Sequence, residues 1–267
     1  MSFPHDGSNH KNAIENEKST KRFLEDNAHL IFPELQKGKY VVEGKGGTTH
    51  KADNIIIPDD GNVINISDKE KRKGIKIGSF DYTNSSKAIK EMVDGKEPNV
   101  RSLKRVVNKS KKDRELTLAK RKKLVEEYRT LVANASYEAL AQMTTKQIIS
   151  LLKNYLVKPN SDMQMFITDG ITRKRYIFPF MNHPVVSLIE NDYIPSIQVK
   201  LGKSSGHVIF TKGDDVQNVG LRIRIHTNNG VSALLGLSKS NAYSQFVFKF
   251  QQDSVPNLIE SVDPIEI

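Results

Sequence analysis

The chain of 267 residues carries 41 Lys and Arg against 31 Asp and Glu, a formal net charge of +10, and it contains no Cys. The excess of positive charge favours a polyanionic partner, of which nucleic acid is the simplest. The lack of Cys excludes disulfides, thiolate metal sites and cysteine nucleophiles. No apolar run approaches the about 20 residues that cross a bilayer, and the first residues lack a secretory signal pattern, so we expect a cytoplasmic protein without a membrane partner.

The first part of the chain predicts one helix followed by three strands. Residues 12–27 carry a partial apolar stripe with helical spacing, and residues 39–43 have the composition of a strand. Two β-branched runs follow, at residues 55–57 and 63–66. The segment between them, residues 58–62, contains Pro, Asp, Gly and Asn, which are the residues of a short hairpin turn. The two runs are therefore expected to pair.

This hairpin brings an acid and a lysine together. Asp53 stands at the head of its first strand and Lys69 near the end of its second. Because side chains alternate between the faces of a strand, Ser67 and Lys69 point the same way and Asp68 points the other way. Magnesium is usually held by one or two carboxylates, water and a substrate phosphate. A nearby lysine can orient the attacking water and offset charge on the phosphate.

With Asp53 before one strand and Ser67-Asp68-Lys69 on the next, the hairpin resembles the PD-(D/E)xK nuclease superfamily, specifically type II restriction endonucleases that cut short palindromic DNA sites. The basic run Lys71-Arg72-Lys73-Gly74 and the segment of residues 78–84 resemble the stretches that follow the lysine in some of these enzymes. The resemblance covers residues 8–90. It implies an α/β fold with a mixed central sheet flanked by helices, a Mg²⁺ cofactor, Asp53 as metal ligand and Lys69 as the residue that orients water.

The sequence departs from that family at the residue two before the lysine. Ser67 stands where the family has Glu, Gln or Asn, and would hold a metal-bound water in place of the family carboxylate. Asp68 or Glu70 would provide the second carboxylate if the strand were bulged. Glu17, on the predicted first helix, is a further candidate metal ligand, because in several members an acid of the first helix approaches the metal.

Two alternative motifs are also present. Asn65-Ile66-Ser67 matches an Asn-containing register but has Ser in the lysine position. Gln198-Val199-Lys200, preceded by Asp192, is by itself a better Q-x-K match than Ser67-Asp68-Lys69. The interval between Asp192 and Gln198 is short and contains Pro195, which leaves little room for two paired strands and a turn, so this motif ranks second.

The middle of the chain is its most basic part. Lys and Arg crowd residues 99–132, and residues 113–134 predict one long amphipathic helix with a cationic outer face. Residues 136–140 resemble a further helix start, and residues 144–152 predict another helix with an N-cap. Cations of this kind bind phosphates and position a protein on DNA without reading its sequence. The residues expected to contact phosphate in this way are Lys71, Arg72, Lys73, Lys120, Arg121, Lys122 and Lys123.

The C-terminal half is rich in predicted strands, which should form an antiparallel sheet. The strands are predicted at residues 163–168, 175–180, 194–201, 207–212, 219–227 and 245–251. A long polar loop over residues 228–243 joins the last two and could contact a DNA groove, because Asn pairs with adenine and Lys with guanine. The DNA contacts expected in this half are Arg222, Arg224, Asn228, Asn229, Lys239 and Asn241.

Together these features predict a site-specific, magnesium-dependent deoxyribonuclease that acts on double-stranded DNA as a monomer or homodimer. Its parts would be residues 1–98 with the catalytic hairpin, residues 99–158 with the basic helix, and a β-rich part over residues 159–267 that continues the N-terminal fold. Two alternatives remain open: a catalytically degenerate DNA-binding protein with a nuclease-like fold, and an RNA-binding accessory protein. No P-loop, dinucleotide-binding fingerprint or nucleophile elbow is present in the sequence.

Overall fold

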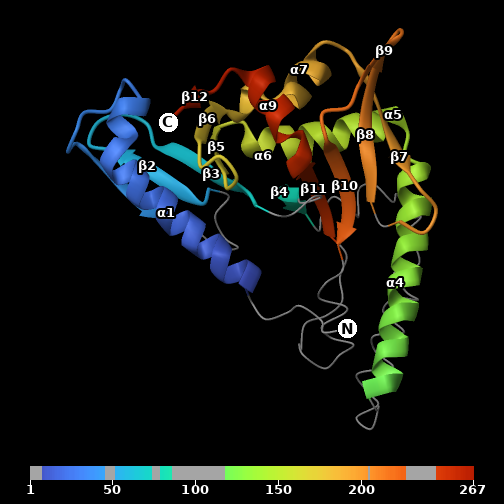
Figure 1. The fold of residues 1–267 in the computed structure, drawn as a ribbon. Coiled ribbons are helices and arrows are strands. Elements are labelled where there is room, and N and C mark those ends of the chain that lie inside the picture. The colour runs from blue at the N-terminus through green and yellow to red at the C-terminus, as the bar shows by residue number, and fades with distance from the viewer. Residues whose placement is uncertain (1–7, 46–51, 74–78, 86–117, 204, 227–244) are drawn as a thin grey trace. The chain divides into compact units, whose positions relative to one another are not determined.

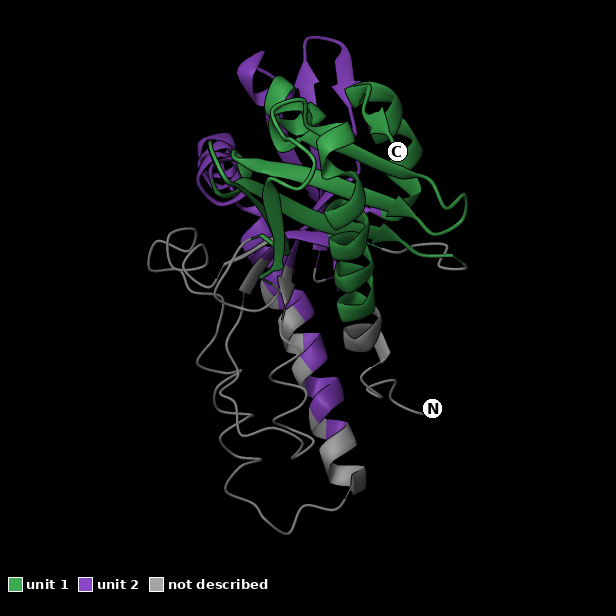
Figure 2. Ribbon diagram, turned by 90° about the vertical axis from the view of Figure 1, so that its left-hand side faces the viewer, with its two compact units in different colours: residues 1–80, 159–187, 252–267 green, residues 81–158, 188–251 purple. Residues whose placement is uncertain are grey.

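The computed structural model describes residues 8–45, 52–73, 79–85, 118–203, 205–226 and 245–267. The chain forms two compact units, each assembled from distant parts of the sequence (Figures 1 and 2). Unit 1 comprises residues 1–80, 159–187 and 252–267, and unit 2 comprises residues 81–158 and 188–251. The mixed α/β class is confirmed. The described strands make two six-stranded sheets, one in each unit.

The sheet of unit 1 is mixed. Its strands, in spatial order, are β1 (Tyr40–Gly44), β2 (Asn54–Pro58), β3 (Ile64–Lys71), β5 (Met163–Asp169), β6 (Arg175–Pro179) and β12 (Ile265–Glu266). The first three form an antiparallel meander, and β5 runs parallel to β3. The predicted hairpin is confirmed, with Ile56 opposite Ile64 and Asn54 opposite Ile66. Gly61 in its turn has φ 110°, a conformation that costs glycine little and other residues much.

The sheet of unit 2 contains β4 (Ser79–Ser85), β11 (Gln245–Gln251), β10 (Leu221–His226), β8 (Ser205–Lys212) and β7 (Ile194–Val199) in this order, and β9 (Asp215–Gln217) also pairs with β8. β10 is antiparallel to both β8 and β11, and β7 is antiparallel to β8. Pro195 is accommodated because β7 lies at the edge of this sheet, where a missing N–H does not break a ladder.

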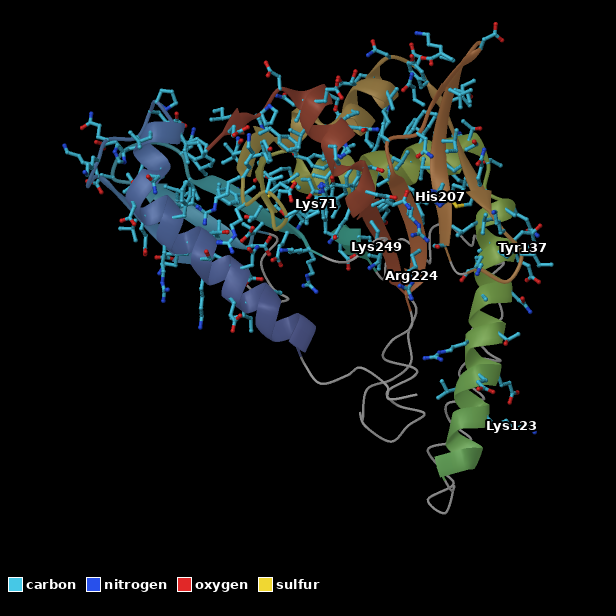
Figure 3. All side chains as sticks on the ribbon, in the orientation of Figure 1. Lys71, Lys123, Tyr137, His207, Arg224 and Lys249 are labelled. Carbon is cyan, nitrogen blue, oxygen red and sulfur yellow. The ribbon has the colours of Figure 1, made fainter. Side chains whose placement is uncertain are left out.

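The helices of unit 2 differ from expectation at one point. α4 (Leu118–Ala141) continues through residues 136–140, where a separate helix was expected. The N-cap of α5 (Thr145–Leu151) is confirmed, because Thr144 and Gln147 form a reciprocal capping box. α5 leads into η1 (Leu152–Val157), a stretch of π-helix. Figure 3 shows Lys123 and Tyr137 projecting from α4.

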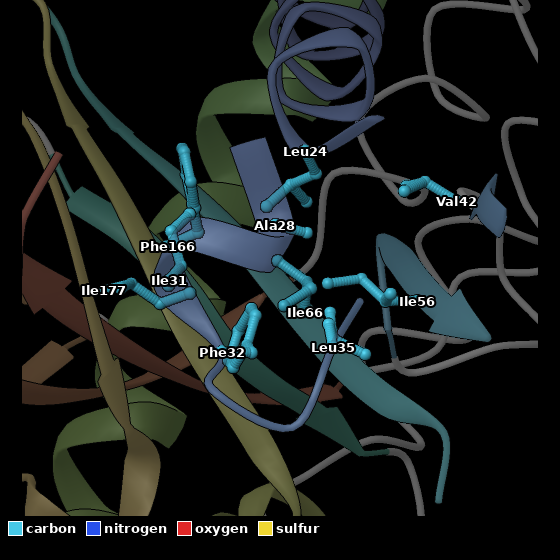
Figure 4. Close-up of a cluster of buried hydrophobic side chains, with 10 residues drawn as sticks. All are labelled: Leu24, Ala28, Ile31, Phe32, Leu35, Val42, Ile56, Ile66, Phe166 and Ile177. Carbon is cyan, nitrogen blue, oxygen red and sulfur yellow. The ribbon is translucent and has the colours of Figure 1, made fainter. Parts of the chain in front are cut away.

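One helix covers the meander of unit 1. Helix α1 (Ser8–Ile31) lays Leu24 and Ala28 on a core that includes Ile56, Ile66 and Phe166 of three neighbouring strands (Figure 4). The remaining helices in the described parts of the chain are short: α6 (Lys158–Asn160), η2 (Phe180–Asn182), α7 (Pro184–Glu190), η3 (Gln252–Ser254) and α9 (Val255–Val262). None of the helices built from described residues has the length and apolar composition needed to cross a membrane.

The core beneath α1 should set the stability of unit 1. Ile56 is fully buried and Ile171 is 55% exposed. Ile56→Ala should therefore cost about 2 to 5 kcal/mol of unfolding free energy, because it leaves a cavity, whereas the matched change Ile171→Ala should cost less than about 1 kcal/mol. Urea unfolding monitored by circular dichroism measures both. Equal losses for the two variants would contradict this packing.

Candidate active site

The backbone of Asp53 is fixed on both sides, directly before β2 begins. Its N–H donates to the carbonyl of Ile66 at 2.9 Å, and its own carbonyl accepts the N–H of Lys45, also at 2.9 Å. These bonds extend the meander by one residue beyond the last paired position, Asn54. Asp53 is thus held between the strands on either side of β2, and its side chain starts from a rigid base.

The carboxylate of Asp53 is fixed as well. Its Oδ2 accepts the backbone N–H of Asp68 at 2.7 Å, a charge-assisted bond at the point where the β2–β3 ladder has ended. The same oxygen lies 3.7 Å from Nζ of Lys69. The side chains of Asp53 and Lys69 are 25% and 12% exposed. The expected proximity of the two is confirmed, and their catalytic roles stay predictions.

Asp68 points away from this pair, toward α1. The amide of Asn16 donates to Asp68 Oδ1 at 3.0 Å, and Thr20, one helical turn later, also interacts with the carboxyl. The β3–β5 ladder runs without interruption from Asn65 to Lys71, so the strand is not bulged there. The proposed role of Asp68 as a second carboxylate in a bulged strand is therefore wrong. The same ladder leaves Glu70 unbulged and on the face of Asp68, so Glu70 cannot take that role either. Ser67 is buried.

Burial raises the pKa of the Asp68 carboxyl to about 7. The negative charge of Asp53 contributes to this increase, while the hydroxyl of Thr20, the ammonium of Lys69 and the amide of Asn16 act in the opposite direction. No hydrogen bond of ordinary geometry reaches Asp68 Oδ2 from the described residues. A desolvated carboxyl with one unsatisfied oxygen favours its protonated form.

A second acid–lysine pair lies farther along β3. Lys71 Nζ is 3.4 Å from Asp169 Oδ2, with the two side chains 15% and 10% exposed. Asp169 Oδ1 accepts the backbone N–H groups of Ile171 and Thr172, so this carboxylate also closes the turn after β5. Burial opposes its ionisation, yet these bonds and the ammonium of Lys71 hold the pKa of Asp169 below its usual value. Lys71 is therefore engaged within the fold.

Of the other two residues of the predicted basic run, Arg72 is bound within the fold and Lys73 is exposed. Arg72 Nε lies 3.5 Å from the Glu70 carboxylate, and the Arg72 N–H donates to Gln252 Oε1 at 3.1 Å. Gln252 in turn donates to the Glu70 carbonyl at 3.1 Å, so one side-chain amide fixes the end of β3. Lys73 is exposed and remains the member of this run best placed for solution contacts. Gln252 could not be identified from the sequence, since it lies far from β3 along the chain.

Glu17, the candidate ligand on the first helix, lies in the part of α1 that packs on β2. Its backbone carbonyl accepts the side-chain amide of Asn54 at 3.3 Å. Two nearby residues of the helix, Asn16 and Thr20, interact with the Asp68 carboxyl of β3. Neither was singled out by sequence, because an Asn and a Thr within a helix resemble ordinary surface residues.

The structure excludes the rival motif. Asp192 precedes β7, at φ 60°, whereas Lys200 follows the strand. A six-residue strand of about 20 Å separates them, so the two side chains cannot share a metal or a water. Asp192, Gln198 and Lys200 are all exposed.

The predicted DNA-binding residues are described in part. Lys123 is exposed on α4, and Arg222 and Arg224 lie half-buried on β10. Lys120, Arg121 and Lys122 belong to α4, but their side chains lie outside the described parts of the structure. The loop residues lie outside the described residues altogether: Asn228, Asn229, Lys239 and Asn241.

The side chains present fit a magnesium ion only if water and substrate supply most of its ligands. Within the described ranges, no three His, Asp or Glu side chains gather as a metal site. Asp53 is partly exposed, and among the described residues no donor is bound to its Oδ1. With respect to the described residues, one carboxylate oxygen is thus available, and water and substrate phosphate would have to complete the coordination, as is common for Mg²⁺.

Comparisons with known proteins add no evidence on this site. No family model matches the chain, and no match was found among curated proteins or solved structures. The chemistry of the site is therefore inferred from the positions of its residues alone.

The raised pKa of Asp68 predicts a pH-dependent stability. A carboxyl whose pKa rises from 3.8 to about 7 on folding stabilises the fold fully below pH 3.8, and this stabilisation is lost as the pH rises through 7. Asp68→Asn removes this dependence. The variant should gain stability relative to wild type between pH 4 and 8, by at most roughly 4 kcal/mol.

Urea unfolding at three pH values across this range measures the effect. Asp60→Asn, at an exposed turn position, is the control and should not reproduce the trend. Parallel pH profiles for wild type and Asp68→Asn would show that the Asp68 carboxyl is ionised in the fold throughout.

Proposed function

We propose that the protein is a magnesium-dependent endonuclease that hydrolyses phosphodiester bonds of double-stranded DNA at specific sites. The observation that carries the proposal is the Asp53 carboxylate, fixed by backbone hydrogen bonds and 3.7 Å from the ammonium of Lys69. An acid before one strand of a hairpin and a lysine on the next is the arrangement that the PD-(D/E)xK resemblance implies. The net charge of +10 supports a polyanionic substrate.

Each residue of the pair has a role that follows from its surroundings. Asp53 offers its remaining oxygen, Oδ1, to the cation, while its Oδ2 is kept in place by the Asp68 N–H. Lys69 lies too far from Oδ2 for a strong hydrogen bond, so its ammonium keeps donors for a water molecule or a phosphate oxygen. Both side chains are mostly shielded from solvent, which strengthens their electrostatic effect.

The reaction is a hydrolysis at phosphorus. The oxygen of a water molecule bonds to phosphorus, one phosphorus–oxygen ester bond breaks, and the departing sugar oxygen takes up a proton. A bound magnesium ion would lower the pKa of a water ligand and polarise a phosphoryl oxygen. Lys69 would hold the attacking water and balance the charge that develops on the phosphate. Ser67 lies on the same strand face as Lys69 and is the candidate for orienting a further water molecule.

Asp53→Asn should abolish cleavage while DNA affinity persists, because the variant keeps the shape of the side chain and removes its charge. Supercoiled plasmid incubated with protein and Mg²⁺ should yield discrete linear fragments with wild type and none with the variant. EDTA should stop the wild-type reaction. A variant preparation that cleaves as fast as wild type would exclude this site, and binding by both proteins without any cleavage would favour a catalytically degenerate DNA-binding protein.

Lys69→Met and Lys71→Met form a matched pair on one face of β3. Each removes a partly buried lysine that faces a carboxylate, but only Lys69 faces Asp53. Lys69→Met should lower the cleavage rate about 100-fold or more, as for loss of one transition-state donor, and Lys71→Met should keep most of the rate. Single-turnover cleavage with excess enzyme provides the comparison. Equal losses would mean that the strand needs both ion pairs for its structure and that Lys69 has no special role.

A further inference from the structure

In the sheet of unit 2, strand β10 presents apolar side chains to one face and cationic side chains to the other. On β10, Leu221 and Ile223 are buried, and Phe250 and Phe248 lie opposite them on β11. Residues directly opposite in an antiparallel pair project to the same face. These four side chains therefore form an apolar layer, and the alternate residues of β10 project to the other face.

The alternate residues of β10 are cations, and a lysine and a histidine lie opposite one of them. Arg222 lies opposite Lys249 on β11 and opposite His207 on β8, and Arg224 lies opposite Ser205 on β8. Figure 3 labels Arg224, His207 and Lys249 on the three adjacent strands. We call Arg222, Arg224, Lys249 and His207 the cationic face.

The counter-charge on this face is small. Asp81 of β4 forms an ion pair with Lys249, with 2.6 Å between Lys249 Nζ and Asp81 Oδ1. Arg222 Nη2 donates to the Ser205 hydroxyl at 2.6 Å, which orients its guanidinium without neutralising it. Burial lowers the pKa of Arg224, Asp81 opposes this effect, and the neighbouring charge of Arg222 adds to it. The Asp81 carboxylate that acts on Arg224 is thus already engaged by Lys249.

Two donors on this face are unsatisfied. The Nε atoms of Arg222 and Arg224 are buried, and neither has a hydrogen-bond acceptor among the described residues. A buried donor without an acceptor costs about 1 to 3 kcal/mol, and more when it is charged. An ordinary solvated charged face would leave these N–H groups in water. A phosphate oxygen is an acceptor that could satisfy these two donors, which have none among the described residues.

We propose that the cationic face binds the phosphate backbone of double-stranded DNA, with Arg222 and Arg224 contacting successive phosphates of one strand. The two arginines are two residues apart on one face of β10, so their Cα atoms are about 7 Å apart. This separation is comparable with that of neighbouring phosphates along a nucleic-acid strand. Guanidinium groups match phosphate geometry better than ammonium groups do. The inference shares its partner with the proposed nuclease function, but it requires no cleavage.

The test measures DNA binding without catalysis. Anisotropy of a labelled DNA duplex is titrated with the full chain in EDTA, at several salt concentrations. The double variant Arg222→Gln/Arg224→Gln should lose at least about tenfold in affinity, and the slope of log affinity against log salt should become shallower by about two, the value for two lost phosphate contacts. Wild-type affinity and slope in a variant with an unchanged circular dichroism spectrum would overturn the proposal.

A charge-matched control separates this site from a general loss of positive charge. Lys200 and Lys203 are both exposed and lie next to each other after β7. Lys200→Gln/Lys203→Gln should leave affinity and slope close to wild type. An equal loss in both double variants would show that only net charge matters and would overturn the proposal.

A measurement on the wild-type protein covers the case in which the arginine variants fail to fold. The Nε–Hε resonances of Arg222 and Arg224, assigned by NMR, should shift when a DNA duplex is added and should not shift with an equal concentration of inorganic phosphate. Unchanged resonances at saturating duplex, equal shifts with phosphate alone, or tighter binding of an RNA duplex would each overturn the proposal. Because binding is measured in EDTA, a failure of cleavage at Asp53 would leave this result unaffected.

Discussion

The antiparallel register between β2 and β3 is the constraint on which the candidate site depends. With Asn54 opposite Ile66, the N–H of Asp68 falls within reach of the Asp53 carboxylate, and Lys69 follows on the same side as that carboxylate. A slip by one residue would exchange the two faces of β3. It would direct Lys69 into the core under α1 and Ile66 away from it. The apolar core and the polar site therefore select the same register.

Helix α1 is tied to this register by polar contacts as well as by apolar packing. Asn16 and Thr20 lie one turn apart and meet the buried carboxyl of Asp68. Burying that carboxyl disfavours its ionised form, so the contact stabilises the fold less than an apolar side chain would. It specifies how the helix lies on β3, however, because its donors must face one residue of the strand. The carboxyl also interacts electrostatically with Asp53 and Lys69 from the other face of β3, so its protonation state changes the charge near the candidate site.

The number of cations in a segment does not by itself identify the surface best suited to bind a polyanion. In unit 1, Lys69, Lys71 and Arg72 each face a carboxylate of the same unit. On the sheet of unit 2, Arg222 and Arg224 have none of their own among the described residues. Each cation that is neutralised within the fold releases fewer counterions on binding a phosphate. The residues with unsatisfied donors are therefore the stronger candidates, although the sequence shows denser runs of Lys and Arg elsewhere.

The sequence was sufficient to predict the hairpin, the cap at Thr144 and the proximity of Asp53 to Lys69. These features depend on turn residues, a capping box and strand alternation, which act over a few positions. The sequence was not sufficient for features that depend on distant partners. Several features join residues that are far apart in the chain. They are the division of the strands into two sheets, the contact of Asn16 with Asp68, the ion pair of Lys71 with Asp169, and the hydrogen bonds of Gln252 at the end of β3. The sequence also suggested that Asp68 could turn toward the metal, and the unbroken β3–β5 ladder directed it to α1 instead. A sequence thus determines which side chains a strand presents to each face, and only the tertiary structure decides what lies against that face, since burial and partner charge are properties of the assembled fold.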